Sequence, residues 1–110
     1  MQAGAAAVAT RPVTAPTSVL HSFDHTSALA HYDQAIARLE LRFGASHPSL
    51  AGLHSSAAAE LCELGRYSAA IVRAERAIAL WTLGGADHAL LDQARVILAR
   101  ARARARSSDE

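Results

Sequence analysis

Aromatic residues are scarce in this chain of 110 residues: Phe, Trp and Tyr together supply 5% of it, although 51% is hydrophobic. Alanine is the largest contributor to the apolar half, and it combines the highest helix propensity with little buried surface per residue. A core of this composition requires helices that approach closely. The shortage of large side chains therefore argues against a thick core and favours an all-α fold with thin layers.

Cysteine pairs, excess charge and long apolar runs are also lacking. The single cysteine, Cys62, excludes an intrachain disulfide framework and fits a reducing compartment. The formal net charge of +1 provides no overall field that would recruit nucleic acid or an anionic membrane. No apolar run approaches the ~18 residues of a membrane span, and the Ala-rich start lacks the basic residues of a signal peptide. We therefore expect a cytoplasmic protein.

Three segments are expected along the chain, which has room for one domain. Pro12 and Pro16 break any helical period near the start, so residues 1–22 are expected to form a flexible N-terminal tail. Residues 23–106 are expected to form a helical domain. Residues 107–110 are expected to be a disordered C-terminus.

From Thr26 onward, apolar residues recur with a period near 3.6, which predicts helices. The predicted helices cover residues 26–42, 47–63, 67–82 and 88–104. Glycines follow the first three, and Ser46 and Asp87 are expected to cap the second and fourth helices by accepting hydrogen bonds from free N–H groups. Because the links are short, neighbouring helices are expected to be antiparallel.

The strongest pattern is an internal repeat. A shift of 42 residues aligns the first predicted helix with the third through the pairs Ala28–Ala70, Ala35–Ala77 and Ile36–Ile78. A shift of 41 residues aligns the second with the fourth through the pairs His47–His88, Leu50–Leu91 and Ala58–Ala99. A fixed period of this size is typical of a helical solenoid, in which paired helices cross closely at small residues such as Ala58, Ala70 and Ala77.

Short motifs give this repeat a family resemblance. Residues 43–48 read Phe-Gly-Ala-Ser-His-Pro, residues 83–89 read Leu-Gly-Gly-Ala-Asp-His-Ala, and residues 65–70 read Gly-Arg-Tyr-Ser-Ala-Ala. Over roughly residues 25–104 the chain resembles tetratricopeptide repeats of the long-period type found in kinesin light chains. His54 and Ala57 depart from the family pattern, which has large apolar residues there. The resemblance implies an antiparallel helix-hairpin α-solenoid fragment of four helices, without a cofactor.

The resemblance also implies a function, because the first helix of each tetratricopeptide unit lines a concave groove. Carried over by alignment, the groove positions are Gly52, Ser55, Ala59, Cys62, Glu63, Gln93, Val96, Arg100 and Arg104. We therefore expect a non-catalytic protein–protein interaction module that binds a protein or peptide segment. Two arginines against Glu63 favour an acidic segment.

Two alternatives remain open. The first predicted helix corresponds to the second helix of a repeat and has lost its hairpin partner. We therefore expect a homodimer through Leu29, Tyr32, Ile36 and Leu41; the alternative is a monomer in which Val19, Leu20 and Phe23 fold back and cover this flank. The arginines of the last helix could instead contact nucleic acid, although no aromatics interleave with them for base stacking. They could also form only the solvated face of a capping helix.

Metal and catalytic chemistry find little support in the sequence. His21 and His25 have the His-x-x-x-His spacing of some metal sites, but they straddle the expected boundary between tail and helix. His54 is expected to lie between helices, neutral and hydrogen-bonded, because an unpaired buried charge is costly. Cys62 has no evident histidine partner, and no phosphate-binding loop is present. We therefore expect neither a metal site nor an enzyme.

Overall fold

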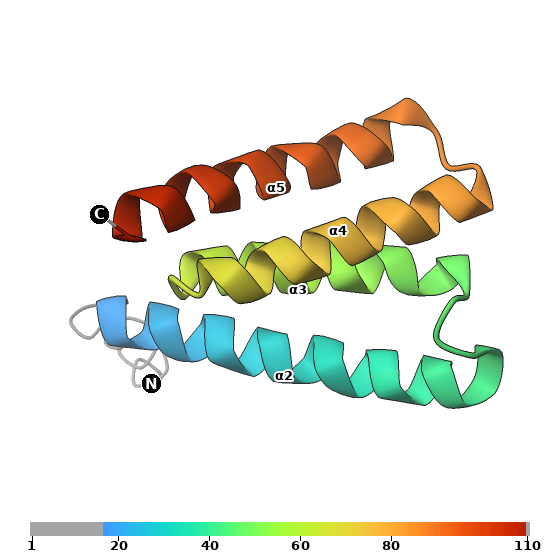
Figure 1. Cartoon of the computed structure of the whole chain (residues 1–110). Coiled ribbons are helices and arrows are strands. Elements are labelled where there is room, and N and C mark those ends of the chain that lie inside the picture. The colour runs from blue at the N-terminus through green and yellow to red at the C-terminus, as the bar shows by residue number, and fades with distance from the viewer. Residues whose placement is uncertain (1–16, 110) are drawn as a thin grey trace, which may run out of the picture.

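The computed structural model describes residues 17–109, and it describes the side chains of residues 24–107. The chain forms four α-helices and a short 3-10 helix: α2 (Thr17–Phe43), η2 (Pro48–Leu50), α3 (Ala51–Glu63), α4 (Tyr67–Gly84) and α5 (His88–Asp109). Successive α-helices run antiparallel, and α3 contacts all three others (Figure 1). The described residues contain no strand. The expected all-α fold of four helices in antiparallel hairpins is confirmed.

Both outer helices are longer than expected. The helix α2 begins at Thr17, nine residues before the predicted start, because no proline or glycine interrupts the chain between Pro16 and Gly44. The helix α5 extends to Asp109 because the Ala-Arg alternation consists of strong helix formers. Of the expected flexible tail, residues 1–16 lie outside the described residues, as does Glu110. None of the described helices is apolar enough over a sufficient length to cross a membrane.

The turn between α3 and α4 depends on Gly65. Its φ of 77° lies in the left-handed region that favours glycine. The turn lets the Gly65 and Arg66 N–H groups donate to the carbonyl oxygens of Cys62 and Leu61, at 3.1 and 2.9 Å. These bonds satisfy carbonyls that the end of α3 would otherwise leave open. The predicted stop at Gly65 is confirmed.

The start of α3 differs from the expectation. His47, rather than Ser46, precedes the first turn, and its Nδ1 accepts a hydrogen bond from the Ser49 N–H at 3.1 Å. Pro48 then opens the short 3-10 helix, where its missing N–H costs nothing. The start of α5 agrees with the sequence, since the Asp87 carboxylate accepts a hydrogen bond from the Leu90 N–H at 3.3 Å.

Alanines occupy the positions where helices cross. Ala58, Ala70 and Ala77 are all 0% exposed, which confirms them as buried close-contact positions. Ala58 and Ala74 form a cluster with Leu98 that joins α3, α4 and α5. The small side chains let these backbones approach, and the larger Leu50 of η2 and Leu80 of α4 form a second cluster with Ile36 of α2. The buried core therefore contains many alanines, in keeping with the composition.

Candidate functional site

A groove runs between α3 and α5 as two successive hollows. These two helices are parallel to each other because the antiparallel α4 lies between them in sequence (Figure 1). Side chains three or four residues apart on each helix therefore share the face that borders the groove. The first hollow encloses about 430 Å³ and is lined by Ser55, Ser56, Ala59, Asp92, Gln93, Val96 and Ile97.

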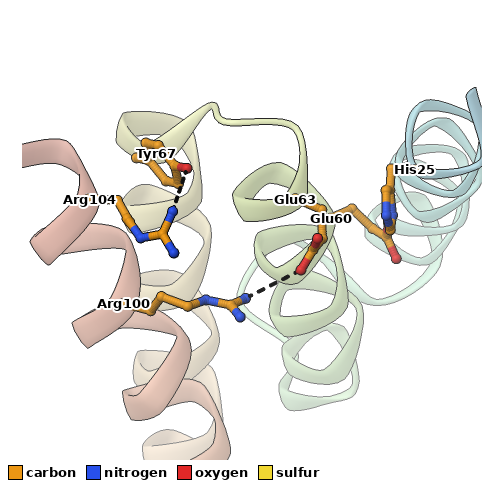
Figure 2. Close-up of polar contacts among 6 residues, drawn as sticks. All are labelled: His25, Glu60, Glu63, Tyr67, Arg100 and Arg104. Carbon is orange, nitrogen blue, oxygen red and sulfur yellow. Dashed lines mark hydrogen bonds and ion pairs between the residues drawn. The ribbon is translucent and has the colours of Figure 1, made fainter. Parts of the chain in front are cut away.

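The second hollow lies one to two helical turns further along the same helices. It encloses about 170 Å³ and is lined by Cys62, Glu63, Tyr67, Arg100 and Arg104. Figure 2 shows both arginines pointing from α5 towards the end of α3 and the start of α4. The Arg100 Nη2 lies 4.0 Å from the Glu63 Oε2, and the Arg104 Nη1 donates to the Tyr67 hydroxyl at 3.5 Å.

Eight of the nine groove positions that the sequence analysis named line these hollows. The first hollow contains Ser55, Ala59, Gln93 and Val96, and the second contains Cys62, Glu63, Arg100 and Arg104. Gly52 lines neither hollow. It is exposed, and a Cβ at that position would lie 4.0 Å from the ring of Trp81 of α4.

Four lining residues were missed by the sequence analysis: Ser56, Tyr67, Asp92 and Ile97. Three of them are chain neighbours of named positions, so a wider helical face would have included them. Tyr67 enters from α4 because the tight turn at Gly65 brings the start of that helix beside the end of α3. The sequence analysis expected two positive charges and one negative charge, from Glu63, in the groove. Asp92 adds a second negative charge.

The charges in the groove are partly matched within the protein. Asp92 accepts a hydrogen bond from Arg95 at 3.3 Å, and Arg100 lies within ion-pair distance of Glu63. Among the described residues, no carboxylate pairs with Arg104, which donates a hydrogen bond to the neutral hydroxyl of Tyr67. Arg104 therefore supplies the least compensated charge in the lining of the groove.

The arginines of α5 do not form one continuous strip. Arg102 points away from the groove and donates to Glu75 of α4 at 2.9 Å. Arg95, Arg100 and Arg102 each have a carboxylate partner. The arginines of α5 thus lie on different faces: Arg100 and Arg104 line the groove, and Arg102 contacts α4.

A polar cluster on the other side of α3 connects three helices. Arg73 of α4 pairs with Asp33 of α2 at 2.5 Å, and its Nη1 contacts the His54 Nδ1 at 3.4 Å. Burial lowers the pKa of His54, and the positive charges of Arg73 and then Arg76 lower it further. His54 thus lies between helices, as expected, and contacts Arg73, and the lowered pKa favours its neutral form. Its Nε2 is buried and has no hydrogen-bond partner within the described residues.

His25 is also engaged within the fold. Its Nδ1 lies 2.5 Å from the Glu60 Oε1, so it joins α2 to α3 (Figure 2). Two carboxylates of α3 thus pair with different helices: Glu60 with His25 of α2, and Glu63 with Arg100 of α5. No group of three His, Cys, Asp or Glu side chains suited to a metal ion occurs in the described part of the chain. The side chain of His21 lies outside the described residues.

The residues expected to mediate self-association are mostly inside the fold. Leu29 and Ile36 are only 9% and 6% exposed, and Tyr32 packs against the same core as Leu29. These three positions form one stripe, spaced by three and four residues, that faces α3. The expected open flank therefore does not contain them. Leu41 alone, at 89% exposed, is available to a second molecule.

Comparisons with known proteins identify no relative. No protein-family model matches the chain, and neither a characterised protein nor a solved structure matches it.

Proposed function

We propose that this protein is a non-catalytic protein-interaction module that binds a polypeptide segment in the groove between α3 and α5. The observation that carries the proposal is the pair of successive hollows on one face of two parallel helices. They combine apolar lining residues with arginines, which is the mixture that peptide-binding surfaces use. The lining contains no histidine that could activate Cys62 or a serine.

We also propose a relationship to the tetratricopeptide repeats. Its support is the sequence repeat together with the parallel placement of α3 and α5, which the shift of 41 residues aligns. The buried thiol of Cys62, which is not in a disulfide, supports a reducing, cytoplasmic location.

Two valines with almost equal exposure provide a matched test. Val96 is 66% exposed and lines the first hollow, whereas Val72 is 65% exposed on α4 and lines neither hollow. Immobilised full-length chains carrying Val96→Lys or Val72→Lys would be compared with the parent for the polypeptides they retain from a cell extract. We expect the parent and Val72→Lys to retain the same polypeptides, and Val96→Lys to fail to retain them. Equal retention by the two variants would contradict a role for the groove.

Self-association is a second candidate function, and the exposure of Leu41 favours it. A leucine that is 89% exposed, two residues before the half-exposed Phe43, offers apolar surface at the end of α2. A dimer through this surface would be weakened by Leu41→Glu. Light scattering at micromolar concentration checks this, and a monomeric parent would exclude it.

Nucleic acid is the less favoured alternative because three arginines of α5 already pair with carboxylates. Phosphate contacts weaken steeply as salt is raised. Binding to duplex RNA that falls steeply between 50 and 200 mM salt would favour this alternative over the groove.

A further inference from the structure

The chemistry of the groove changes along its length. The first hollow is bordered by the apolar side chains of Ala59, Val96 and Ile97, whereas the second contains the two arginines. Building on the proposed function, we infer that the groove selects an extended segment with one apolar side chain and one carboxylate about three to four residues apart. The apolar side chain occupies the first hollow, and the carboxylate reaches Arg104.

An extended segment fits the groove better than a helix does. The α-helices α3 and α5 contact each other directly, so the groove between them is narrow. A helix with its side chains is about 10–12 Å wide, whereas neighbouring extended strands lie only about 4.8 Å apart. The hollows of about 430 and 170 Å³ can each admit a side chain from an extended backbone.

Helix geometry sets the distance between the two features of the ligand. Measured along α5, Arg100 and Arg104 lie about 5 and about 11 Å beyond the midpoint of Val96 and Ile97, at 1.5 Å per residue. An extended chain advances about 3.3 Å per residue, so the interval to Arg100 corresponds to about two residues and the interval to Arg104 to about three to four residues. A carboxylate next to the apolar residue would fall short of Arg104.

The surrounding charges favour a single carboxylate. Arg104 has no carboxylate partner among the described residues, while Glu63 partly neutralises Arg100. A dianionic phosphate would meet Glu63 and the negative C-terminal end of α3 in the same hollow. At the opposite end of the groove, Asp92 disfavours an acidic residue beside the apolar side chain. The position and number of negative charges in the ligand are therefore both restricted.

Synthetic peptides test this directly with the full-length chain. A series of fluorescent, amide-capped peptides would carry one leucine and one glutamate separated by zero to six alanines. Fluorescence anisotropy at low salt measures binding. We expect the tightest binding with two or three intervening alanines, and we expect replacement of the glutamate by glutamine to weaken it about tenfold.

Two arginine variants assign the effect to one side chain. Arg104→Ala is expected to abolish the preference for glutamate over glutamine, whereas Arg106→Ala, which removes an exposed arginine outside the hollows, should retain it. Three results would overturn the inference. Affinity could be independent of the spacing between leucine and glutamate, or Arg104→Ala could weaken binding of the glutamine peptides as much as that of the glutamate peptides. The third is tighter binding of a phosphoserine peptide than of the glutamate peptide. Absence of peptide binding while retention still depends on Val96 would overturn this inference alone. Equal retention by Val96→Lys and Val72→Lys would instead overturn the proposed function.

Discussion

The helices α3 and α5 occupy equivalent places in the sequence repeat, but they are held in the fold differently. Leu50 just before α3 and Leu91 in α5 are aligned by the shift of 41 residues, and both are buried. Ala58 and Ala99 are also aligned, yet Ala58 is 0% exposed and Ala99 is exposed. The difference arises because α2 and α4 both cover α3, whereas α4 is the main neighbour of α5.

One wall of the groove is therefore fixed by packing, and the other is less constrained. Seven residues of α3 are buried, including most of its alanines, so few substitutions are compatible with its neighbours. In α5 the buried stripe is Leu91, Ala94, Leu98 and Ala101. Ile97 also packs against the core, but the exposed positions of α5 can vary without disturbing it. Differences in ligand preference between related chains are thus expected mainly on α5.

The largest effect tests how α5 is attached. Leu98→Ala removes the leucine that packs against Ala58 and Ala74, and we expect it to lower the free energy of unfolding by about 2–3 kcal/mol. Val96→Ala, in the exposed part of the same helix, should change it by less than about 0.5 kcal/mol. Urea unfolding measures both. Similar losses for the two variants would mean that α5 is not attached through this stripe.

The second effect compares the aligned alanines directly. Ala58→Leu should overpack the crossing of α3 with α4 and cost about 1–3 kcal/mol, whereas Ala99→Leu should be nearly neutral. Thermal unfolding followed by circular dichroism provides the measurement. An unchanged melting temperature for Ala58→Leu would contradict the tight packing of α3.

The third effect concerns pH and the buried face of α3. The folded state lowers the pKa of His54 through burial and through Arg73 and Arg76, against the opposing effects of Glu40 and Asp33. The unfolded chain then binds a proton at higher pH than the folded chain does. The stability that neutral His54 contributes is present above about pH 6.5. It is lost as the pH falls towards the pKa of His54 in the folded state.

Urea unfolding at pH 7.5, 6.5 and 5.5 measures this loss. For a single proton the slope cannot exceed about 1.4 kcal/mol per pH unit. We expect His54→Gln to show a flatter dependence than the parent because it retains polarity without titrating. Identical slopes in the two proteins would show that His54 does not contribute.

The smallest effect is expected from the outer face of α5. The pair of Arg102 and Glu75 joins side chains that are 51% and 52% exposed, and exposed ion pairs contribute about 0–1 kcal/mol. Arg102→Ala should therefore change unfolding only slightly, and it should leave peptide binding unchanged because Arg102 does not line the groove. If Arg102→Ala lost as much peptide affinity as is expected for Arg104→Ala, then Arg102 would also contribute to ligand binding.

The sequence predicted the fold through local features with a direct physical cause. Gly44 and Gly65 end helices because their backbones adopt φ values of 88° and 77°. The early start of α2 was missed because residues 17–25 have no clear apolar period, although nothing interrupts a helix there. His47 was missed as the capping residue because serine is the commoner choice and the two residues are adjacent.

The groove was predictable in position but not in its charge pattern. The alignment of repeats placed Ser55 and Val96 on one surface because equivalent helices face the same way. The same alignment placed Arg100 and Arg104 in the groove, and Arg102, two residues from each, on another face of α5. It did not predict which carboxylates pair with these arginines, because Glu63 and Glu75 come from other helices. Likewise, the burial of Leu29 follows from which neighbour covers α2, which the periodicity of one helix does not specify.

The end-to-end succession of hairpins has a kinetic consequence. Most helix contacts join helices that follow one another along the chain, so the chain closes mainly short loops as it folds. Folds dominated by such local contacts reach the native state in microseconds to milliseconds. The contacts of α3 with α5 and of η2 with α4 span longer stretches. At the second of these, a Cβ on Gly84 would lie 2.7 Å from the Cβ of Pro48. A side chain at Gly84 is therefore expected to leave the hairpins able to form while hindering the last step, the closure of η2 against the end of α4.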